Sequence, residues 1–210
     1  MSIGRIILTD ACVAEGAAWL CARDARWAQA MAGCGPLPLR RQADGFGALL
    51  SAIVGQQVSI ASANAIWARL EGAGLTDQST MALATDAELR AVGLSRQKAR
   101  YGRALAQAGI DFKVLRDVPD ADVLATLVAV PGIGAWTAEI YAMFALGRAD
   151  VFAHGDLALQ EAARGLFGLD VRPVEKEMRV MAQAWSPWRS VAARILWAHY
   201  RVMKARDGIR

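Results

Sequence analysis

Two glycines flank a single apolar residue in the segment VPGIGAWTAE, residues 130–139. Gly132 and Gly134 would be costly inside a helix, and they suit a sharp turn or a backbone that comes close to a ligand. The start of the following helix offers unpaired N–H groups and partial positive charge, to which Thr137 adds a hydroxyl donor. The segment therefore predicts a binding site for an anion such as a phosphodiester, although a tight helical hairpin without a ligand has the same pattern.

A carboxylate ends the segment FAHGD, residues 152–156, directly before the helix-like run LALQEAARGLF. By position alone, Asp156 is a helix N-cap, because aspartate commonly accepts hydrogen bonds from the first N–H groups of a helix. A catalytic role needs support from elsewhere in the sequence.

The elements that position these residues are predicted to be helices. Helical spacing of apolar residues recurs along nearly the whole chain, as in Phe46, Leu49, Leu50, Ile53 and Val54. Capping signals precede several of these runs at Thr85 with Glu88, Ser95 and Asp120. No alternating strand pattern is convincing, so the predicted fold class is all-α. Residues 33–45, GCGPLPLRRQADG, are the best candidate for a linker.

Composition narrows the class of protein. The 210 residues are 55% hydrophobic and carry 24 basic against 20 acidic side chains, which permits a nucleic-acid partner without demanding one. Cys12, Cys21 and Cys34 are widely spaced, which argues against a disulfide scaffold or a metal site. Asp10 interrupts the only short apolar run near the N-terminus, and no run is long enough to span a bilayer. We expect a cytoplasmic protein without a membrane partner, associated with the nucleoid if bacterial.

Three segments together resemble the alkylpurine branch of the helix-hairpin-helix (HhH-GPD) DNA glycosylase superfamily, the 3-methyladenine DNA glycosylase II type. They are IVGQQVSIASANAI, VGLSRQKARYGRALA and LVAVPGIGAWTAEIYAMFALGRADVFAHGDLALQ. The resemblance extends from about Phe46 to Trp197, and the combination is more specific than any single segment. It implies a protein of base-excision repair that acts on double-stranded DNA containing alkylated bases, as a monomer.

The resemblance implies that the ligand of the glycine turn is DNA. In the family the hairpin holds a DNA phosphate next to the lesion, a role that carries over to Gly132, Gly134 and Thr137. The family hairpin also often binds a monovalent cation, Na⁺ or K⁺, through backbone carbonyls. The matching carbonyls here belong to Val128, Val130 and Ile133.

The resemblance also makes Asp156 the catalytic carboxylate. Breaking an N-glycosidic bond builds positive charge on the deoxyribose, which a carboxylate can stabilise while it orients or deprotonates water. Trp136 and Trp197 match positions of pocket tryptophans, where an electron-rich ring attracts a flipped cationic purine. Each could instead be ordinary core. Trp197 falls on the same helical side as Ser190, Arg194 and Arg201, off the main apolar stripe, which favours a pocket or DNA role over deep burial.

Other matches limit the chemistry. Bifunctional relatives have a lysine where this chain has Trp136, so a monofunctional glycosylase without lyase activity is expected. No cysteine follows Cys34, so no iron–sulfur cluster is expected, and no cofactor is required. Gln57 matches the family's intercalating wedge, although Gln56 and Gln57 could simply cap the turn. His154 stands where the family often has proline or a small apolar residue, and it could contact DNA or approach Asp156.

The predicted organisation has two helical subdomains. Residues 1–40 and 151–210 form one bundle from both termini, residues 41–150 form the other with the hairpin, and the active site occupies a cleft between them. Two alternatives remain open: a non-catalytic helix-hairpin-helix DNA-binding protein, and a glycosylase for an oxidised or deaminated base. A helical interaction domain is the least specific reading.

Overall fold

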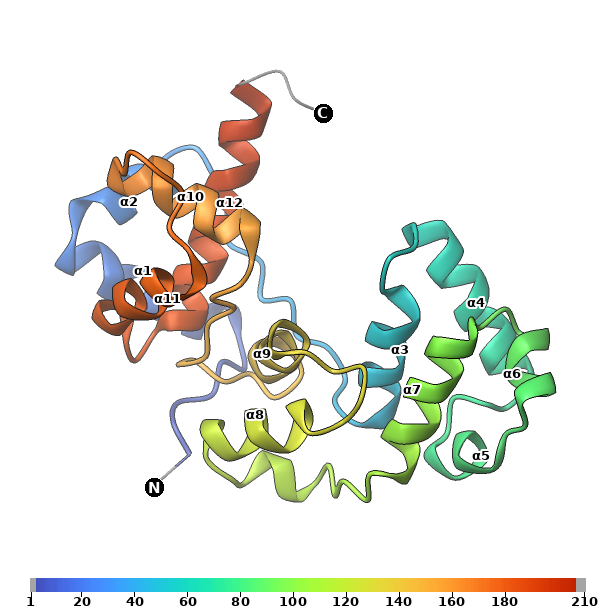
Figure 1. Cartoon of the computed structure of the whole chain (residues 1–210). Coiled ribbons are helices and arrows are strands. Elements are labelled where there is room, and N and C mark those ends of the chain that lie inside the picture. The colour runs from blue at the N-terminus through green and yellow to red at the C-terminus, as the bar shows by residue number, and fades with distance from the viewer. Residues whose placement is uncertain (1–2, 207–210) are drawn as a thin grey trace. The chain divides into compact units, whose positions relative to one another are not determined.

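The computed structural model describes residues 3–206, and these residues confirm the all-α prediction (Figure 1). Within that range no β-strand occurs, and one isolated antiparallel bridge joins Ile6 to Arg148. No helix of residues 3–206 has both the length and the apolar character needed to cross a bilayer. The chain divides into two compact units, which we call the terminal unit (Met1–Arg41 with Ala142–Arg210) and the hairpin unit (Gln42–Tyr141).

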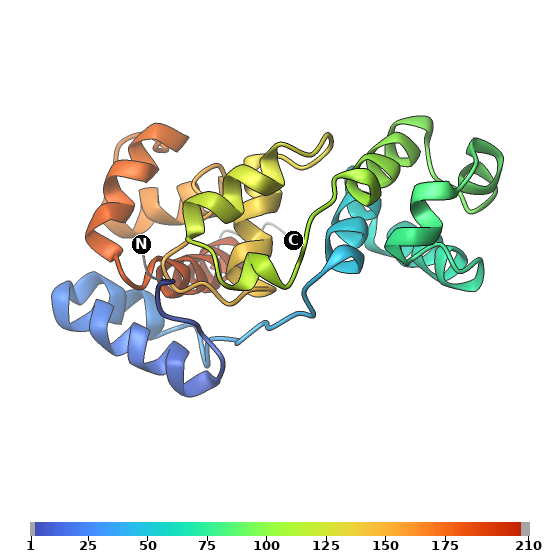
Figure 2. The same cartoon turned by 90° about the horizontal axis from the view of Figure 1, so that it is seen from below.

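The hairpin unit holds most of the short helices. Their bounds are α3 Phe46–Gly55, α4 Ile60–Gly72, α5 Gln78–Leu83, α6 Asp86–Ala91, α7 Arg96–Gln107, the 3₁₀ turn η1 Val114–Arg116 and α8 Asp120–Val128. Helix α9, Ala135–Phe144, begins in this unit and ends in the other. Helix α7 packs against α3, α5 and α6, and α3 also packs against α4. Figure 2 shows α3 (blue) and α7 (green) side by side.

The terminal unit is built from both ends of the chain. Its helices are α1 Asp10–Arg23, α2 Ala25–Met31, α10 Leu157–Phe167, α11 Glu175–Met181, the 3₁₀ turn η2 Ala182–Trp185 and α12 Arg189–Arg206. Helix α12 contacts α1, α2 and α10, which lie around it. Helices α1 and α2 are separate because Asp24 is extended and caps the second one through the Arg26 N–H.

Capping side chains set several helix starts as predicted. Thr85 and Glu88 form the reciprocal capping box of α6, and the Ser95 hydroxyl accepts from the Lys98 N–H at the start of α7. Asp120 is instead the first helical residue of α8, after Pro119. Helix α11 begins at Glu175, two residues after Pro173, and Val174 is its N-cap residue.

Aromatic side chains fill the core of the terminal unit. Trp185 lies at the centre, with its ring centroid 5.3 Å from that of Trp27, 5.2 Å from that of Phe152 and 5.9 Å from that of Phe167. Trp27 and Trp185 are almost fully buried, at 2% and 4% exposure. Large rings buried in this way account for much of a unit's stability, so these tryptophans are core residues.

Candidate functional site

The glycine turn connects α8 to α9 and is anchored on both sides. Ile133 and Val130 are buried at 3% and 4% exposure, and the Ile133 N–H donates to the Val130 carbonyl across 3.0 Å. Gly132 has φ +93°, a left-handed conformation that side chains other than glycine rarely adopt. A Cβ on Gly132 would also lie 2.5 Å from Cδ2 of Tyr101 on α7. The residue must be glycine for both reasons.

Gln56 ties this turn to helix α3. Its side-chain Nε2 donates to the Gly132 carbonyl across 2.9 Å, although the two residues are 76 positions apart. A Cβ on Gly134 would meet no atom within 4 Å, so the space beside that glycine is open. The turn is therefore rigid at Gly132 and accessible at Gly134, which suits an anion that approaches the first N–H groups of α9.

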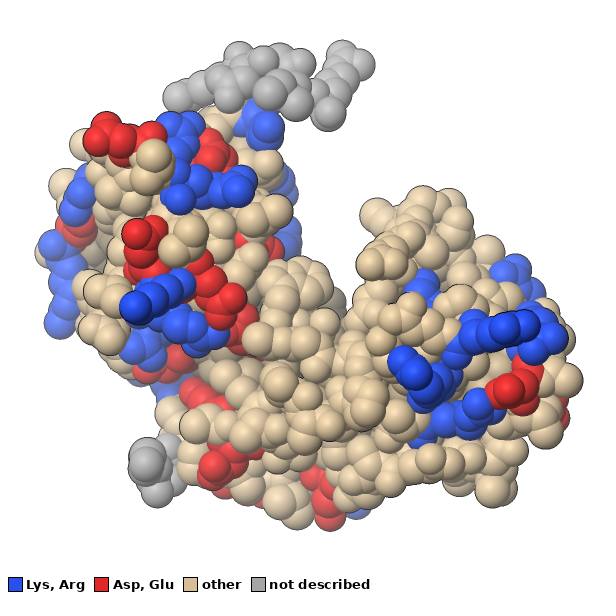
Figure 3. Space-filling model, in the orientation of Figure 1, with Lys and Arg blue, Asp and Glu red and all other residues tan. Residues whose placement is uncertain are grey.

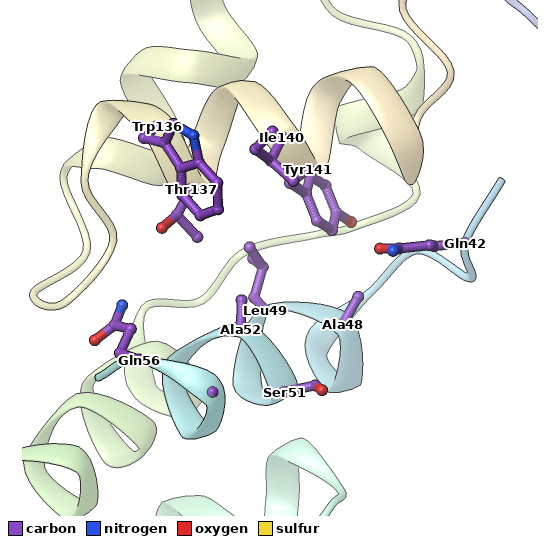
Figure 4. A pocket seen from close by; sticks show the side chains of 11 residues that line it. Gln42, Ala48, Leu49, Ser51, Ala52, Gln56, Trp136, Thr137, Ile140 and Tyr141 are labelled. Carbon is purple, nitrogen blue, oxygen red and sulfur yellow. The ribbon is translucent and has the colours of Figure 1, made fainter. Parts of the chain in front are cut away.

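A cavity of about 410 Å³ opens between α3 and the first turns of α9 (Figure 4). Trp136 and Thr137 face it from α9, and Gln56 lies at one end with Gln42 at the other. Trp136 is 49% exposed, unlike the tryptophans of the core. Its ring therefore offers an aromatic surface to a planar group, whereas Thr137 is 8% exposed.

Tyr141 stands on the same wall of the cavity, one turn further along α9. Its phenol oxygen accepts a hydrogen bond from the Gly45 N–H across 2.8 Å, which fixes the start of α3. Burial raises the pKa of Tyr141 to about 12, and the Gly45 hydrogen bond opposes that shift without cancelling it. The phenol therefore stays neutral at ordinary pH and contributes no charge to the cavity.

Gln57 leaves the end of α3 in a left-handed conformation with φ +56°. It is exposed, and the residues that follow it, Val58 and Ile60, are 39% and 81% exposed. Gln56, the C-cap residue of α3, bonds to the hairpin instead. The two neighbouring glutamines thus differ: Gln56 is bonded to the hairpin, whereas Gln57 is exposed.

Asp156 lies in the terminal unit and is the N-cap of α10. Its Oδ1 accepts from the Ala158 N–H at 2.9 Å and from the Leu159 N–H at 3.0 Å. The N-cap prediction is therefore confirmed, and the side chain is half-buried. These bonds fix the carboxylate by the backbone. Nearby, the His154 ring makes an edge contact with Phe152, and its carbonyl accepts from Gln160.

Trp197 belongs to an aromatic contact within the terminal unit. Its ring centroid lies 5.8 Å from that of Phe144, and the Arg194 guanidinium lies 4.7 Å from the Phe144 ring. Its neighbours on the same side of α12 are buried, since Ser190 is 0% and Arg194 is 2% exposed. Arg194 donates to the Leu39 carbonyl across 3.0 Å, which holds the linker segment on this side of the helix. Trp197 itself is half-buried.

Burial lowers the pKa of Arg194 to about 10, with a further contribution from the nearby charges of Arg40 and Arg41. In the sequence, Arg194 and Arg201 share one side of the last helix, and this pattern did not indicate that Arg194 is buried. The burial depends on the tertiary structure, in which the Leu39 carbonyl of the linker accepts a hydrogen bond from Arg194.

Sequence reasoning also missed Gln56, Gln42 and Tyr141 as parts of the cavity. Gln56 had a weak signal, because it stands beside the predicted wedge. Gln42 and Tyr141 had none, since α3 and α9 meet around this cavity only in the tertiary structure. Among residues 3–206, no three His, Cys, Asp or Glu side chains gather as a metal site would require. The Val130 carbonyl of the predicted cation site accepts from Ile133.

Comparison with known proteins identifies the family of the chain. Residues 50–190 match the model of the HhH-GPD superfamily base excision DNA repair protein. The chain belongs to this superfamily. The matched range contains the Gln56 and Gln57 turn, the hairpin and Asp156, so the HhH-GPD pattern covers both units.

Two curated HhH-GPD relatives illustrate the likeness. A Bacillus subtilis protein named putative DNA-3-methyladenine glycosylase YfjP is 34% identical over 114 residues, which cover 52% of this chain and 40% of that protein. Escherichia coli DNA-3-methyladenine glycosylase 2 is 30% identical over 168 residues, which cover 73% of this chain and 57% of that enzyme. The chain thus spans about half the length of these relatives.

Solved structures match over more of the chain. The crystal structure of DNA-3-methyladenine glycosidase from Bacillus halodurans has a TM-score of 0.80 and 33% identity, and the match covers 89% of each chain. The Schizosaccharomyces pombe 3-methyladenine DNA glycosylase Mag1, in complex with abasic DNA, has a TM-score of 0.74 and 24% identity. That match covers 87% of this chain and 95% of Mag1, and it supports the fold alone.

Proposed function

We propose that the chain is a base-excision repair glycosylase that hydrolyses the N-glycosidic bond of alkylated purines, of the 3-methyladenine type, in double-stranded DNA. The observation that carries this proposal is the half-exposed Trp136 ring over a cavity of about 410 Å³ beside the hairpin. Alkylation at N3 or N7 gives a purine a positive charge, and such a base gains cation–π attraction and stacking on an indole. The names of the relatives described above support the same substrate class.

The hairpin would hold the DNA backbone near the lesion. The open space at Gly134 and the N–H groups at the start of α9 suit a phosphate oxygen, and Thr137 adds a donor beside them. Backbone amides fixed by the Gln56 bond need little rearrangement to bind. Gln57 would enter the duplex from the minor groove and fill the gap that the flipped nucleotide leaves.

Asp156 would supply the catalytic carboxylate. As the bond from the sugar C1′ to the purine nitrogen breaks, its electron pair moves to the base, which becomes neutral and leaves. The carboxylate stabilises the cationic sugar, water oxygen bonds to C1′, and the water proton passes to the carboxylate or to solvent. A cationic leaving group departs readily, so one carboxylate suffices without a strong general acid.

The same residues limit the reaction. Trp136 offers no amine to attack the sugar, so the product is an abasic site and the strand stays intact. The proposed enzyme needs no cofactor and no iron–sulfur cluster, and a structural Na⁺ or K⁺ at the carbonyls of Val128, Val130 and Ile133 would stiffen the hairpin. It would act as a monomer in the cytoplasm.

The test is release of free bases from methylated duplex DNA, identified by mass spectrometry. We expect 3-methyladenine to be released by the wild-type protein, and the rate to fall at least about 100-fold in Asp156→Asn. Asparagine caps helices as well as aspartate does, so the variant should fold and still bind DNA. Release of only oxidised or deaminated bases would change the substrate class, and DNA binding without any release would leave a non-catalytic hairpin protein.

A second measurement tests the monofunctional assignment. We expect strand breaks only after alkali treatment of the product, and no covalent enzyme–DNA adduct when borohydride is present during the reaction. A trapped adduct would contradict the absence of an amine nucleophile, whichever base is released.

A further inference from the structure

Arginines gather around a hollow on α6 and α7, within the hairpin unit. The cavity measures about 240 Å³. We call it the arginine hollow, and its lining consists of Asp86, Arg90, Leu94, Arg96, Ala99, Arg100 and Arg103. Figure 3 shows blue side chains spread over this part of the surface, with little red among them. Four arginines against one aspartate leave this small area with a strong excess of positive charge.

Most of this charge is not neutralised by the protein. The Arg103 guanidinium forms an ion pair with Asp86 across 2.5 Å and also donates to the Ala84 carbonyl. Arg100 lies 5.4 Å from the centre of the Tyr101 ring. Over the described range 3–206, no carboxylate pairs with Arg90, Arg96 or Arg100, and all three are exposed. They are available to an anion from outside.

The placement of these arginines is unfavourable for helix α7 itself. Arg96 is the first residue of the helix, where the macrodipole disfavours a cation, and the first turn contains no acidic residue. Arg96, Arg100 and Arg103 follow at i, i+4 and i+7, so like charges neighbour each other on one stripe. This arrangement of arginines lowers the stability of α7, and binding of an anionic partner by the stripe would explain why it is present.

The spacing fits the backbone of a nucleic acid. From Arg96 to Arg103 the helix rises about 10.5 Å, a length over which one DNA strand carries about three phosphates. Guanidinium groups bind phosphate oxygens through paired hydrogen bonds. Buried Leu94 and Ala99 belong to the lining and provide a firm support for the long side chains.

We propose that the arginine hollow binds the phosphodiester backbone of duplex DNA, as a contact separate from the hairpin. The inference rests on the proposed function, and it adds a second, sequence-independent DNA contact to it. Helix α7 serves both contacts with different faces. Tyr101 packs against Gly132 of the hairpin turn, whereas the neighbouring Arg100 lines the hollow.

The experiment measures binding of an undamaged, fluorescently labelled duplex by anisotropy between about 50 and 200 mM salt. The test variant is Arg96→Gln with Arg100→Gln, which leaves the Arg103–Asp86 ion pair intact. Loss of two phosphate contacts should reduce the slope of log affinity against log salt by about 1.8, and weaken binding about 10- to 60-fold near 0.1 M salt. Thermal unfolding should occur at the same or a higher temperature, because repulsion along α7 is relieved.

The control is Arg23→Gln with Arg172→Gln, which removes the same charge from two exposed arginines of the terminal unit. This control should keep the wild-type salt slope. An unchanged slope in the test variant, or an equal loss in the control, would overturn the proposal. Displacement of the duplex by inorganic phosphate at matched ionic strength, or by polyglutamate as strongly as by DNA, would identify a free anion or an acidic protein as the ligand and would also overturn it.

This binding assay is independent of base release. A protein that binds undamaged DNA through the arginine hollow but releases no alkylated base would contradict the proposed function only. A protein that releases alkylated bases while the test variant keeps its salt slope would contradict the hollow only.

Discussion

Replacement of Gly132 by alanine tests whether the hairpin turn has the conformation on which the phosphate contact depends. Alanine at φ +93° would cost about 1–2 kcal/mol in backbone strain. The new Cβ would also lie 2.5 Å from Cδ2 and 2.8 Å from Cβ of Tyr101, and relief of such a clash costs about 1–3 kcal/mol. Together these terms predict a loss of about 2–5 kcal/mol in the free energy of unfolding.

Thermal and urea unfolding measure this loss, which corresponds to a fall of about 4–20 °C in the unfolding temperature for a chain of this size. A second variant separates the two terms. Tyr101→Ala combined with Gly132→Ala removes the clash with the Tyr101 ring and keeps both the backbone strain and the 2.8 Å approach to Cβ of residue 101, so the double-mutant cycle should show a coupling of at least about 1 kcal/mol.

Gly134→Ala is the matched control for folding and the sharper test of binding. No atom lies within 4 Å of its added Cβ, so the free energy of unfolding should change by less than about 1 kcal/mol. Affinity for duplex DNA should nevertheless fall, because the methyl group would occupy the approach to the α9 N–H groups. An unchanged unfolding temperature in Gly132→Ala would refute the argument from backbone strain. Wild-type affinity for DNA in Gly134→Ala would refute the proposed phosphate contact at the hairpin.

Three further predictions concern the remaining site residues. Asp156→Ala should lose about 1 kcal/mol of stability through the missing cap of α10, whereas the asparagine variant should unfold like the wild type, and calorimetry of the two compares them. Trp136→Ala should lower base release while changing the free energy of unfolding by less than about 1 kcal/mol, because the ring is 49% exposed. Trp185→Ala should instead lower the free energy of unfolding by about 3–5 kcal/mol, because that ring is buried. Equal losses for the two variants in chemical unfolding would contradict this prediction. The pKa of Tyr141 is raised to about 12 in the folded state, so its stabilising contribution is complete below about pH 10 and is lost as the pH rises through 12. Between pH 9 and 12, the free energy of unfolding of the wild type should therefore fall by about 2–3 kcal/mol more than that of Tyr141→Phe. Parallel plots of unfolding free energy against pH for the two proteins would contradict this prediction.

The local pattern of the chain was sufficient to predict its fold class and many helix starts. Thr85 with Glu88, and Ser95, cap helices by bonds to residues three positions away, so their signals are contained in short segments. The Gly-x-Gly turn was readable for the same reason, since a turn and a helix start are local features. The break at Asp24, whose extended backbone divides α1 from α2, depends on a single residue and was not predicted.

The roles of the tryptophans could not be read from spacing. Trp27 and Trp185 are core residues, whereas Trp136 is half-exposed over a cavity. The difference depends on which helix covers each ring. The burial of Arg194 has the same origin, because the Leu39 carbonyl that accepts from it lies 155 residues away in sequence.

The sequence by itself determined the residues with local tasks: the glycines of the hairpin, the cap at Asp156 and the absence of an amine at Trp136. Only the tertiary structure decided that Tyr101 makes Gly132 irreplaceable, that Gln56 bonds to the hairpin, and that the arginines of α7 share one hollow with Arg90. Caps and turns form between residues a few positions apart, whereas cavities and charged surfaces form where distant segments meet, and their packing is not encoded in any one stretch of the chain.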